Sequence, residues 1–353
     1  MNKFDYMAKY GYEQLVYFYD KETGLKGITC IHNTTLGPAL GGTRLWNYAT
    51  EEDAVLDVLR LARGMTYKNS AAGLNLGGGK TVLIGDASKV KSEAYWRAFG
   101  RYVQSLNGRY ITAEDVNTNT DDMDYIAMET SYITGLRKTS GDPSPFTALG
   151  TYWGMKAACQ EKYGNNSLKG KKVAVQGVGH VGYYLVKLLA EEGAEIIICD
   201  IKQENIDQIT KEFNVTVVGP NDIYGVECDI YAPCALGATV NDDTIPQFKC
   251  DIIAGSANNV LKEEKHGVML EEKGILYAPD YVINAGGVIN VYQELIGYDR
   301  EESEKKVISI YDRMLEVFRI AKEEKITTAE AADRMAEIRI QRIGNVRKNY
   351  IKR

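Results

Sequence analysis

KGKKVAVQGVGHVG, residues 169–182, is the stretch that decides how the second half of this chain folds. The apolar run VAVQ leads into a glycine-rich turn, and the residues after the turn repeat apolar side chains at helical spacing. Strand, glycine loop and helix in that order open a βαβ unit. Apolar runs at 196–200, 215–218, 228–235, 251–258 and 275–284, interrupted by helical segments, are predicted strands, which indicates a parallel sheet with both faces covered.

The glycines of this turn fit the spacing G-x-G-x-x-G. The first glycine of that pattern permits a tight turn, the second lets the backbone approach a pyrophosphate, and the third lets the helix pack closely on the strand. An acid, Asp200, ends the next predicted strand, where it can accept hydrogen bonds from ribose hydroxyls and repel a 2′-phosphate. A glycine turn without a ligand is the alternative interpretation. We therefore predict an NAD site in which Asp200 disfavours NADP. The loop residues predicted to bind the cofactor are Gly177, Val178, Gly179, His180, Val181 and Gly182.

The first half of the chain repeats the alternation of apolar runs and helical segments, and a stretch rich in Gly, Ser and Pro follows it at 135–150. A chain of 353 residues exceeds the size at which a single hydrophobic core usually stops growing. We therefore expect an N-terminal α/β domain over 1–134 and a second domain over 135–329, with a C-terminal helix at about 330–353 packing back on the first. The strands predicted in the first domain are 13–20, 26–33, 80–86 and 109–115, and its helices are about 51–68 and 91–106.

Composition restricts the kinds of partner. The formal net charge of −6 argues against nucleic acid or a membrane surface, because both need a dominant basic face. The start of the chain lacks an apolar signal core and no run reaches the roughly 18 residues that span a bilayer, so we expect a cytoplasmic protein. The six cysteines form no C-x-x-C pair and are expected to be reduced thiols, and three histidines without a ligand motif predict no metal site.

Two lysines, Lys68 and Lys80, flank a glycine-rich segment. The stretch GLNLGGGKTVLIGD, residues 73–86, nearly matches the phosphate loop G-x-x-x-x-G-K-[ST], but Leu74 stands where the first glycine is required. Glycines remove side chains around Lys80 and let backbone and substrate approach it. An ammonium group in such a partly dry place, near a second one, gives up its proton more readily, which suits acid–base chemistry.

Asp115 ends a predicted strand and begins a loop, where the ligands of open α/β sheets gather. A helix N-cap is the alternative for this side chain, and Asn119 or Asp121 could fill the same position. The residue pattern leaves both readings of Asp115 open.

Several longer stretches resemble one enzyme family. They occur in the family's order over nearly the whole chain: LGPALGGTRLW (36–46), RGMTYKNSAAGLNLGGGKTVLIGD (63–86), YITAEDVNTN (110–119), GVGHVG (177–182), CDIYAPCALGATVND (228–242), IIAGSANN (252–259) and LYAPDYVINAGGVINV (276–291). The chain is similar in them to the glutamate, leucine, phenylalanine and valine dehydrogenases, and closest to the leucine branch. The resemblance implies an α/β fold of two domains, an N-terminal substrate and oligomerisation domain and a Rossmann-like NAD-binding domain, with a cleft between them. It also implies a homo-oligomer, expected to be an octamer.

The activity implied by the resemblance is reversible oxidative deamination of an L-amino acid to its 2-oxo acid and ammonia, with NAD taking the hydride. In such enzymes the lysine matching Lys68 binds the substrate carboxylate. The lysine matching Lys80 acts as acid and base on the carbinolamine and on the attacking water, and the aspartate matching Asp115 exchanges protons with the amino group. Thr147 and Asn259 match positions near the nicotinamide end of the cofactor, and Asn284 matches the loop that closes the cleft. Turn capping is the alternative for each of them.

The resemblance also bears on the substrate. Where the glutamate enzymes carry a lysine for the distal carboxylate this chain has Leu40, and a buried carboxylate without a cation is costly. The matched pocket is apolar, which predicts leucine as substrate together with valine and isoleucine. Asn117, Asn119, Phe146 and Gly182 look nearer to the aromatic branch, so phenylalanine or tryptophan is the alternative, and a catalytically silent NAD-binding regulator is a third possibility. The pocket residues are Leu40, Gly41, Ala113, Val288 and Val291.

Overall fold

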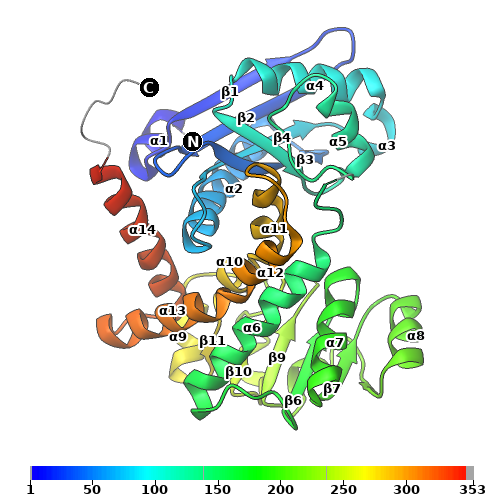
Figure 1. Ribbon diagram of the computed structural model, residues 1–353, viewed down its shortest axis with the longest axis vertical. Helices are drawn as coiled ribbons and strands as arrows, with labels where there is room; N and C mark the ends of the chain where they lie inside the picture. Colours follow the sequence, from blue (N-terminus) through cyan, green and yellow to red (C-terminus); the bar gives the residue numbers. More distant parts are fainter. Residues whose placement is uncertain (1, 138, 236, 347–353) are drawn as a thin grey trace. The chain divides into compact units, whose positions relative to one another are not determined.

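The structure, a computed structural model, describes residues 2–137, 139–235 and 237–346 (Figure 1). Its contacts divide the chain into two compact units. The first unit holds the described residues within 1–142, 291–298 and 336–353, and the second holds those within 143–290 and 299–335. Helix α11 (Gly286–Glu294) and helix α14 (Thr328–Val346) therefore each begin in the second unit and end in the first.

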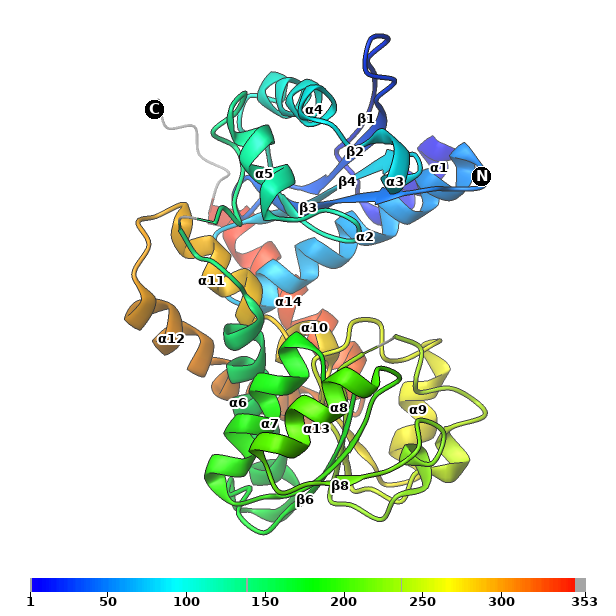
Figure 2. The same cartoon turned by 90° about the vertical axis from the view of Figure 1, so that its right-hand side faces the viewer.

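The first unit is built on a five-stranded sheet in the order β1-β2-β4-β3-β5. Strands β1 and β2 pair antiparallel, as do β2 and β4, whereas β3 runs parallel to both β4 and β5. Figure 2 shows helices α4 and α5 on one face of this sheet and α2 on the other. The elements are β1 (Gln14–Tyr19), β2 (Lys26–Asn33), β3 (Ala39–Trp46), β4 (Gly77–Ile84), β5 (Tyr110–Glu114), α1 (Lys3–Tyr10), α2 (Glu51–Ala71), α3 (Ala87–Val90), α4 (Glu93–Ser105) and α5 (Thr120–Ala127).

Both faces of this sheet carry a hydrophobic core. Successive residues of a strand point to opposite faces, so Val82 and Leu83 of β4 enter different cores. Val82 packs in a cluster that includes Val58 of α2, and Leu83 packs in one that includes Trp96 and Phe99 of α4. Burial on both faces explains why β4 ends in the continuous apolar run Val82–Ile84 rather than in an alternating pattern.

Strand β3 was not identified from the sequence, although it lies between β4 and β5 in the sheet. Its sequence, ALGGTRLW, contains two glycines and no valine or isoleucine, a composition atypical of strands. Contacts across the sheet account for both glycines. A Cβ at Gly41 would lie 1.8 Å from the carbonyl oxygen of Gly79, and a Cβ at Gly42 would lie 2.2 Å from that of Glu114.

The second unit contains a six-stranded sheet in the order β11-β10-β9-β6-β7-β8, and all its strand pairs are parallel. The predicted α/β class and the Rossmann-like parallel sheet are confirmed. The strands are β6 (Lys172–Gln176), β7 (Glu195–Cys199), β8 (Thr216–Val217), β9 (Ile230–Pro233), β10 (Ile252–Ile253) and β11 (Leu276–Tyr277); the helices are α6 (Ser144–Tyr163), α7 (His180–Glu192), α8 (Gln203–Glu212), α9 (Lys265–Glu272), α10 (Asp280–Ile283), α12 (Arg300–Ile308) and α13 (Ile310–Glu324), with 3-10 turns at Ile223–Gly225 and Ile245–Gln247.

One predicted strand of this unit is in fact a short strand followed by a short helix. The run 275–284 was expected to be a single strand, but β11 ends at Tyr277 and the helix α10 begins at Asp280. Pro279 stands at the N-cap of α10, and proline is compatible with a helix start but cannot donate to a strand ladder. Among the described residues, no helix is long and apolar enough to cross a membrane.

Candidate active site

Lys80 and Asp115 come together at the middle of the first unit's sheet. Lys80 lies on β4, and Asp115 directly follows the end of β5. The Lys80 side chain is only 7% exposed, and its Nζ lies 3.0 Å from Oδ2 of Asp115. Because β3 lies between β4 and β5, this ion pair spans two strand positions of the sheet. A lysine this buried is uncommon, and its charge has a direct partner.

Other parts of the protein occupy the space where side chains would stand at two of the glycines before Lys80. A Cβ at Gly78 would lie 2.1 Å from the backbone nitrogen of Thr66 in α2, and a Cβ at Gly77 would lie 1.9 Å from the carbonyl oxygen of Asn33. The close approach of backbone expected at these glycines is therefore present at Gly77 and Gly78. Their absent side chains let α2 and the end of β2 press against β4, which fixes the backbone that carries Lys80.

Asp115 is held by a second cation that the sequence analysis did not select. Nε of Arg44 lies 3.0 Å from the same oxygen of Asp115, and Nη1 of Arg44 lies 3.0 Å from Oδ2 of Asp57. The hydroxyl of Tyr48 donates to that oxygen of Asp57. Burial alone would raise the pKa of Asp115, but the charges of Lys80 and Arg44 outweigh it and lower the pKa, so the group is a carboxylate. The sequence does contain a signal for this second cation, because Arg44 ends the stretch GGTR, residues 41–44.

The capping alternative for Asp115 is resolved by the helix that follows. Asn119 is the N-cap of α5, and its side chain accepts a hydrogen bond from the backbone of Asp122 in a reciprocal capping box. Asp115 therefore does not fill that position. Its neighbour Glu114 has a pKa raised to about 7, because of burial and the nearby charges of Asp122 and Asp142.

The remaining predicted residues of the first unit lie on the same elements. Lys68 is in the last turn of α2 and is partly exposed. On β3, Leu40 is 2% exposed and lies across from Ile111 of β5, while Gly41 lies across from Thr112. Ala113, partly exposed on β5, lies across from Gly42, so these matched pocket positions are clustered on two adjacent strands. The other two, Val288 and Val291, are in α11 and belong to the second and the first unit respectively.

In the second unit the glycine loop has the features that a dinucleotide site requires. Gly177 has φ +93°, and a Cβ there would lie 2.5 Å from the Cβ of Ala235. A Cβ at Gly182 would lie 2.2 Å from the carbonyl oxygen of Gly177, so the third glycine permits close helix packing as predicted. At Gly179 a Cβ would meet none of the described atoms within 4 Å. The space beside the second glycine is therefore free for a ligand to approach the backbone.

Helix α7, which follows this loop, has no side-chain cap at its N-terminus among the described residues. Gly179 is the N-cap of α7, with His180 and Val181 in its first turn, and the described residues supply no side-chain hydrogen bond to that cap. The free N–H groups and the helix dipole there favour an anion. Within the described part of the chain, the site fits a pyrophosphate.

Asp200 is tied to the glycine loop. It accepts hydrogen bonds from the backbone of Val178 at 2.8 Å, from the backbone of Lys202 at 2.8 Å and from the side chain of Asn205 at 3.1 Å. Burial acts to raise the pKa of Asp200, but these hydrogen bonds outweigh it and lower the pKa. The carboxylate predicted to select the ribose is thus charged and fixed beside the loop.

The three positions matched toward the nicotinamide differ in their surroundings. Asn284 is 3% exposed, and its amide nitrogen donates to Oδ1 of Asn258 at 2.8 Å, while its own Oδ1 has no partner among the residues described. A buried acceptor in that state is suited to a ligand's donor. Asn259 takes the left-handed conformation with φ +52° and is exposed, and the hydroxyl of Thr147 donates to the carbonyl oxygen of Pro143 at 3.1 Å.

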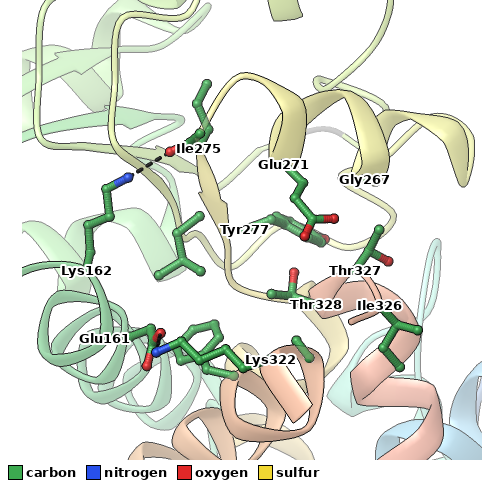
Figure 3. A pocket seen from close by; sticks show the side chains of 14 residues that line it. Glu161, Lys162, Gly267, Glu271, Ile275, Tyr277, Lys322, Ile326, Thr327 and Thr328 are labelled. Atoms are coloured by element: carbon green, nitrogen blue, oxygen red, sulfur yellow. Dashed lines mark hydrogen bonds and ion pairs between the residues drawn. The ribbon is translucent and has the colours of Figure 1, made fainter. Parts of the chain in front are cut away.

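A pocket of about 420 Å³ lies elsewhere in the second unit, beside the edge strand β11 (Figure 3). Nζ of Lys162 donates to the carbonyl oxygen of Gly274 at 2.7 Å, and Lys322 pairs with Glu161 at 2.5 Å. These contacts already engage both lysines and Glu161 of its lining. None of the site residues predicted from the sequence lines it, and we assign it no role.

The side chains of Asp242, Glu263 and His266 are close enough to hold a cation. Lys265 already places its Nζ 2.9 Å from Asp242. Nδ1 of His266 accepts a hydrogen bond from the backbone of Glu263 at 2.9 Å, which assigns the ring proton to Nε2, the nitrogen facing Asp242. A ring in this form offers no lone pair toward the cluster, so these residues do not fit a metal.

A parallel sheet with an open glycine loop and an acid fixed beside it defines a dinucleotide-binding α/β protein. The family model for the dimerisation domain of Glu/Leu/Phe/Val dehydrogenases matches residues 13–132, and the Glutamate/Leucine/Phenylalanine/Valine dehydrogenase model matches residues 140–200 and 198–347. The chain belongs to this family, and it is an amino acid dehydrogenase that works with a nicotinamide cofactor.

Individual relatives agree with the family models. A leucine dehydrogenase of Thermoactinomyces intermedius is 63% identical over 99% of this chain and 97% of its own length. A leucine dehydrogenase of Bacillus cereus is 61% identical over 99% of this chain and 96% of its own. Among solved structures, the L-tryptophan dehydrogenase of Nostoc punctiforme has a TM-score of 0.88 and 47% identity, covering 97% of this chain and 99% of that one.

Proposed function

We propose that this enzyme catalyses the reversible, NAD-dependent oxidative deamination of L-leucine, and of valine and isoleucine, to the 2-oxo acid and ammonia. The observation that carries the proposal is the buried ion pair of Lys80 and Asp115 at 3.0 Å, since it provides two acid–base groups at one place. The relatives at 63% and 61% identity, both leucine dehydrogenases, support leucine.

In the proposed mechanism each group of the pair has a separate task. Asp115, a carboxylate with a lowered pKa, accepts hydrogen bonds from the substrate's ammonium group and takes a proton from it. As the neutral amine, Lys80 takes a proton from the attacking water, and as the resulting ammonium it returns one to the carbinolamine as ammonia leaves. Lys68, at the end of α2, binds the substrate carboxylate. When bound, the nicotinamide supplies the hydride acceptor.

Selection of the cofactor is assigned to the charged Asp200 and to the open N-terminus of α7. Asp200 accepts hydrogen bonds from the adenosine ribose and repels a 2′-phosphate, which favours NAD. The amides of residues 179–182, to which the described residues supply no side-chain cap, would hold the pyrophosphate next to Gly179. Asn284 would offer to a donor of the nicotinamide end the Oδ1 that has no partner among the described residues, and Thr147 and Asn259 are assigned to the same end of the cofactor.

The apolar positions Leu40, Gly41, Ala113, Val288 and Val291 are proposed to contact the substrate side chain. One methylene in an apolar pocket separates substrates by only about 1–3 kcal/mol, so valine and isoleucine should be accepted with leucine. The solved tryptophan enzyme, at 47% identity, makes an aromatic substrate the second candidate. A homo-octamer and a cytoplasmic location complete the proposal.

A panel of substrates tests this function. NADH formation is followed by absorbance with leucine, valine, isoleucine, phenylalanine, tryptophan and glutamate, each with NAD and with NADP. We expect leucine with NAD to give the highest kcat/KM and glutamate to give none. Phenylalanine or tryptophan as the best substrate would replace the branched-chain assignment, and no NADH from any substrate would favour a regulatory protein.

Lys80→Ala separates the chemistry from cofactor binding. Lys80 is in the first unit and the glycine loop is in the second, so the dissociation constant for NADH should stay within about threefold while turnover falls by 10³-fold or more. Near-native turnover of this variant would reject the role of Lys80.

A further inference from the structure

Two of the six cysteines face each other across neighbouring strands of the second unit. Strands β9 and β10 are parallel, and their register pairs Ile230 with Ile252. The same register continues ahead of the strands, where Glu227 pairs with Lys249 in an isolated parallel bridge. Between these two pairs it places Cys228 directly opposite Cys250. Side chains at paired positions of parallel strands point to the same face of the sheet.

The two thiols are close enough to act on one another. The Cys250 side chain raises the pKa of Cys228, and both cysteines are free. The same interaction lowers the pKa of the Cys250 thiol, because a thiolate there accepts the hydrogen bond of Cys228. Neighbouring strands are about 4.8 Å apart, which falls within the Cα separation that a disulfide requires. Two thiols set in this way need little backbone movement to bond.

The pair is also open on one side. Cys250 is 8% exposed and packs among Phe248, Tyr231 and other residues of the core, whereas Cys228 is only partly buried. A small reagent can therefore reach Cys228 from solvent, with Cys250 behind it as the second sulfur. Of the other thiols of the described chain, Cys30, Cys159 and Cys199 are buried, in β2, α6 and β7, and Cys234, directly after β9, is partly buried.

We propose that Cys228 and Cys250 are a redox-active dithiol that forms a disulfide across β9 and β10 with low-molecular-weight disulfides of the glutathione type. One protein thiolate attacks the small disulfide, forms a mixed disulfide and releases one small thiol. The other cysteine then attacks the mixed disulfide, which forms the intramolecular S–S bond and releases a second small thiol. The protein loses two electrons and two protons, and the small disulfide gains both.

The position of the pair determines what this bond would do. Both cysteines precede the amino ends of their strands, while the glycine loop follows the carboxyl end of β6, the other neighbour of β9. The bond should therefore leave the cofactor loop unchanged. It would close a ring from 228 to 250, which contains β9 and the 3-10 turn Ile245–Gln247, and so restrict the unfolded chain. The expected effect is a more stable second unit with unchanged cofactor affinity, whatever the substrate proves to be.

The test uses the full-length protein equilibrated with reduced or oxidised glutathione and then trapped with an alkylating reagent. We expect oxidised glutathione to lower the count of free thiols from six to four, and peptide mass spectrometry to find Cys228 linked to Cys250. The thermal midpoint of the oxidised form should be about 3–8 °C above that of the reduced form, with the dissociation constant for NADH unchanged within twofold.

Single variants check the assignment. Cys228→Ser and Cys250→Ser should each abolish both the cross-link and the difference between the two thermal midpoints, whereas the matched control Cys159→Ala should keep both. The wild-type mapping needs no variant, so a poorly folding mutant leaves the test intact. Six free thiols after full equilibration, or a disulfide that joins any other cysteines, would overturn the proposal.

Discussion

At Asp115 two cations share one carboxylate oxygen. Nζ of Lys80 and Nε of Arg44 each lie 3.0 Å from Oδ2, and together they hold the pKa of Asp115 low although burial acts to raise it. Arg44→Gln removes one positive charge, so the pKa of Asp115 should rise. If deamination requires the carboxylate form, the acid limb of the pH profile of kcat/KM should move to higher pH by the same amount. Arg44 would then be a positioning residue that acts through Asp115.

A second arginine provides the control for this measurement. Arg101 pairs with Glu129 at 3.3 Å on the surface of α4, where its side chain is 76% exposed. Arg101→Gln should give the wild-type pH profile. An unmoved acid limb in Arg44→Gln, in protein that is folded by circular dichroism, would show that Arg44 does not set the protonation of Asp115.

At the scale of elements, the loop between β6 and α7 uses its glycines for different purposes, and two substitutions separate them. Gly177→Ala puts a Cβ 2.5 Å from that of Ala235 on a backbone with φ +93°, so it should lower the thermal midpoint by several degrees. Gly179→Ala meets ordinary φ and open space, so the fold should be retained. Its methyl group would occupy the side from which a pyrophosphate approaches, and the dissociation constant for NADH should rise tenfold or more.

Calorimetry without ligand and NADH titration, applied to both variants, measure these two effects separately. The expected pattern is a loss of stability at Gly177 and a loss of affinity at Gly179. If Gly179→Ala binds NADH as wild type does, the pyrophosphate does not lie against that backbone.

How far the sequence predicts these elements depends on whether the deciding contacts are local. The β6–loop–α7 segment was predicted because strand, glycines and helix follow one another in the chain. Strand β3 was missed because the reason for Gly41 is a carbonyl oxygen of Gly79, on another strand. The pairing of Lys80 with Asp115 likewise depends on how β4, β3 and β5 are ordered, which no local pattern contains. The family resemblance selected both residues, but it did not indicate Arg44 as the second cation.

At the scale of the whole molecule, the first unit is made from three separate parts of the chain. Its last part is the end of α14, which packs on the segment between α2 and β4. The hydroxyl of Ser70 donates to the carbonyl oxygen of Ala336 at 2.8 Å. Arg339 donates to the carbonyl oxygens of Leu74 and Gly73 at 2.7 and 3.2 Å. These contacts fix the turn that precedes β4, the strand that carries Lys80.

Arg339→Ala should therefore lower the stability of the first unit. Apart from Val291, the predicted site residues of that unit are far from Arg339 in sequence. The substitution removes charged hydrogen bonds to carbonyl oxygens of the turn, and a loss of about 2 kcal/mol in the free energy of unfolding is expected from urea titration. Arg342 lies one turn further along α14 and is exposed, so Arg342→Ala is the matched control and should stay within about 0.5 kcal/mol of wild type. Because the turn leads into β4, Arg339→Ala should also lower kcat while leaving the dissociation constant for NADH unchanged. Equal stabilities for the two variants would mean that the return of α14 does not support the strand that carries Lys80.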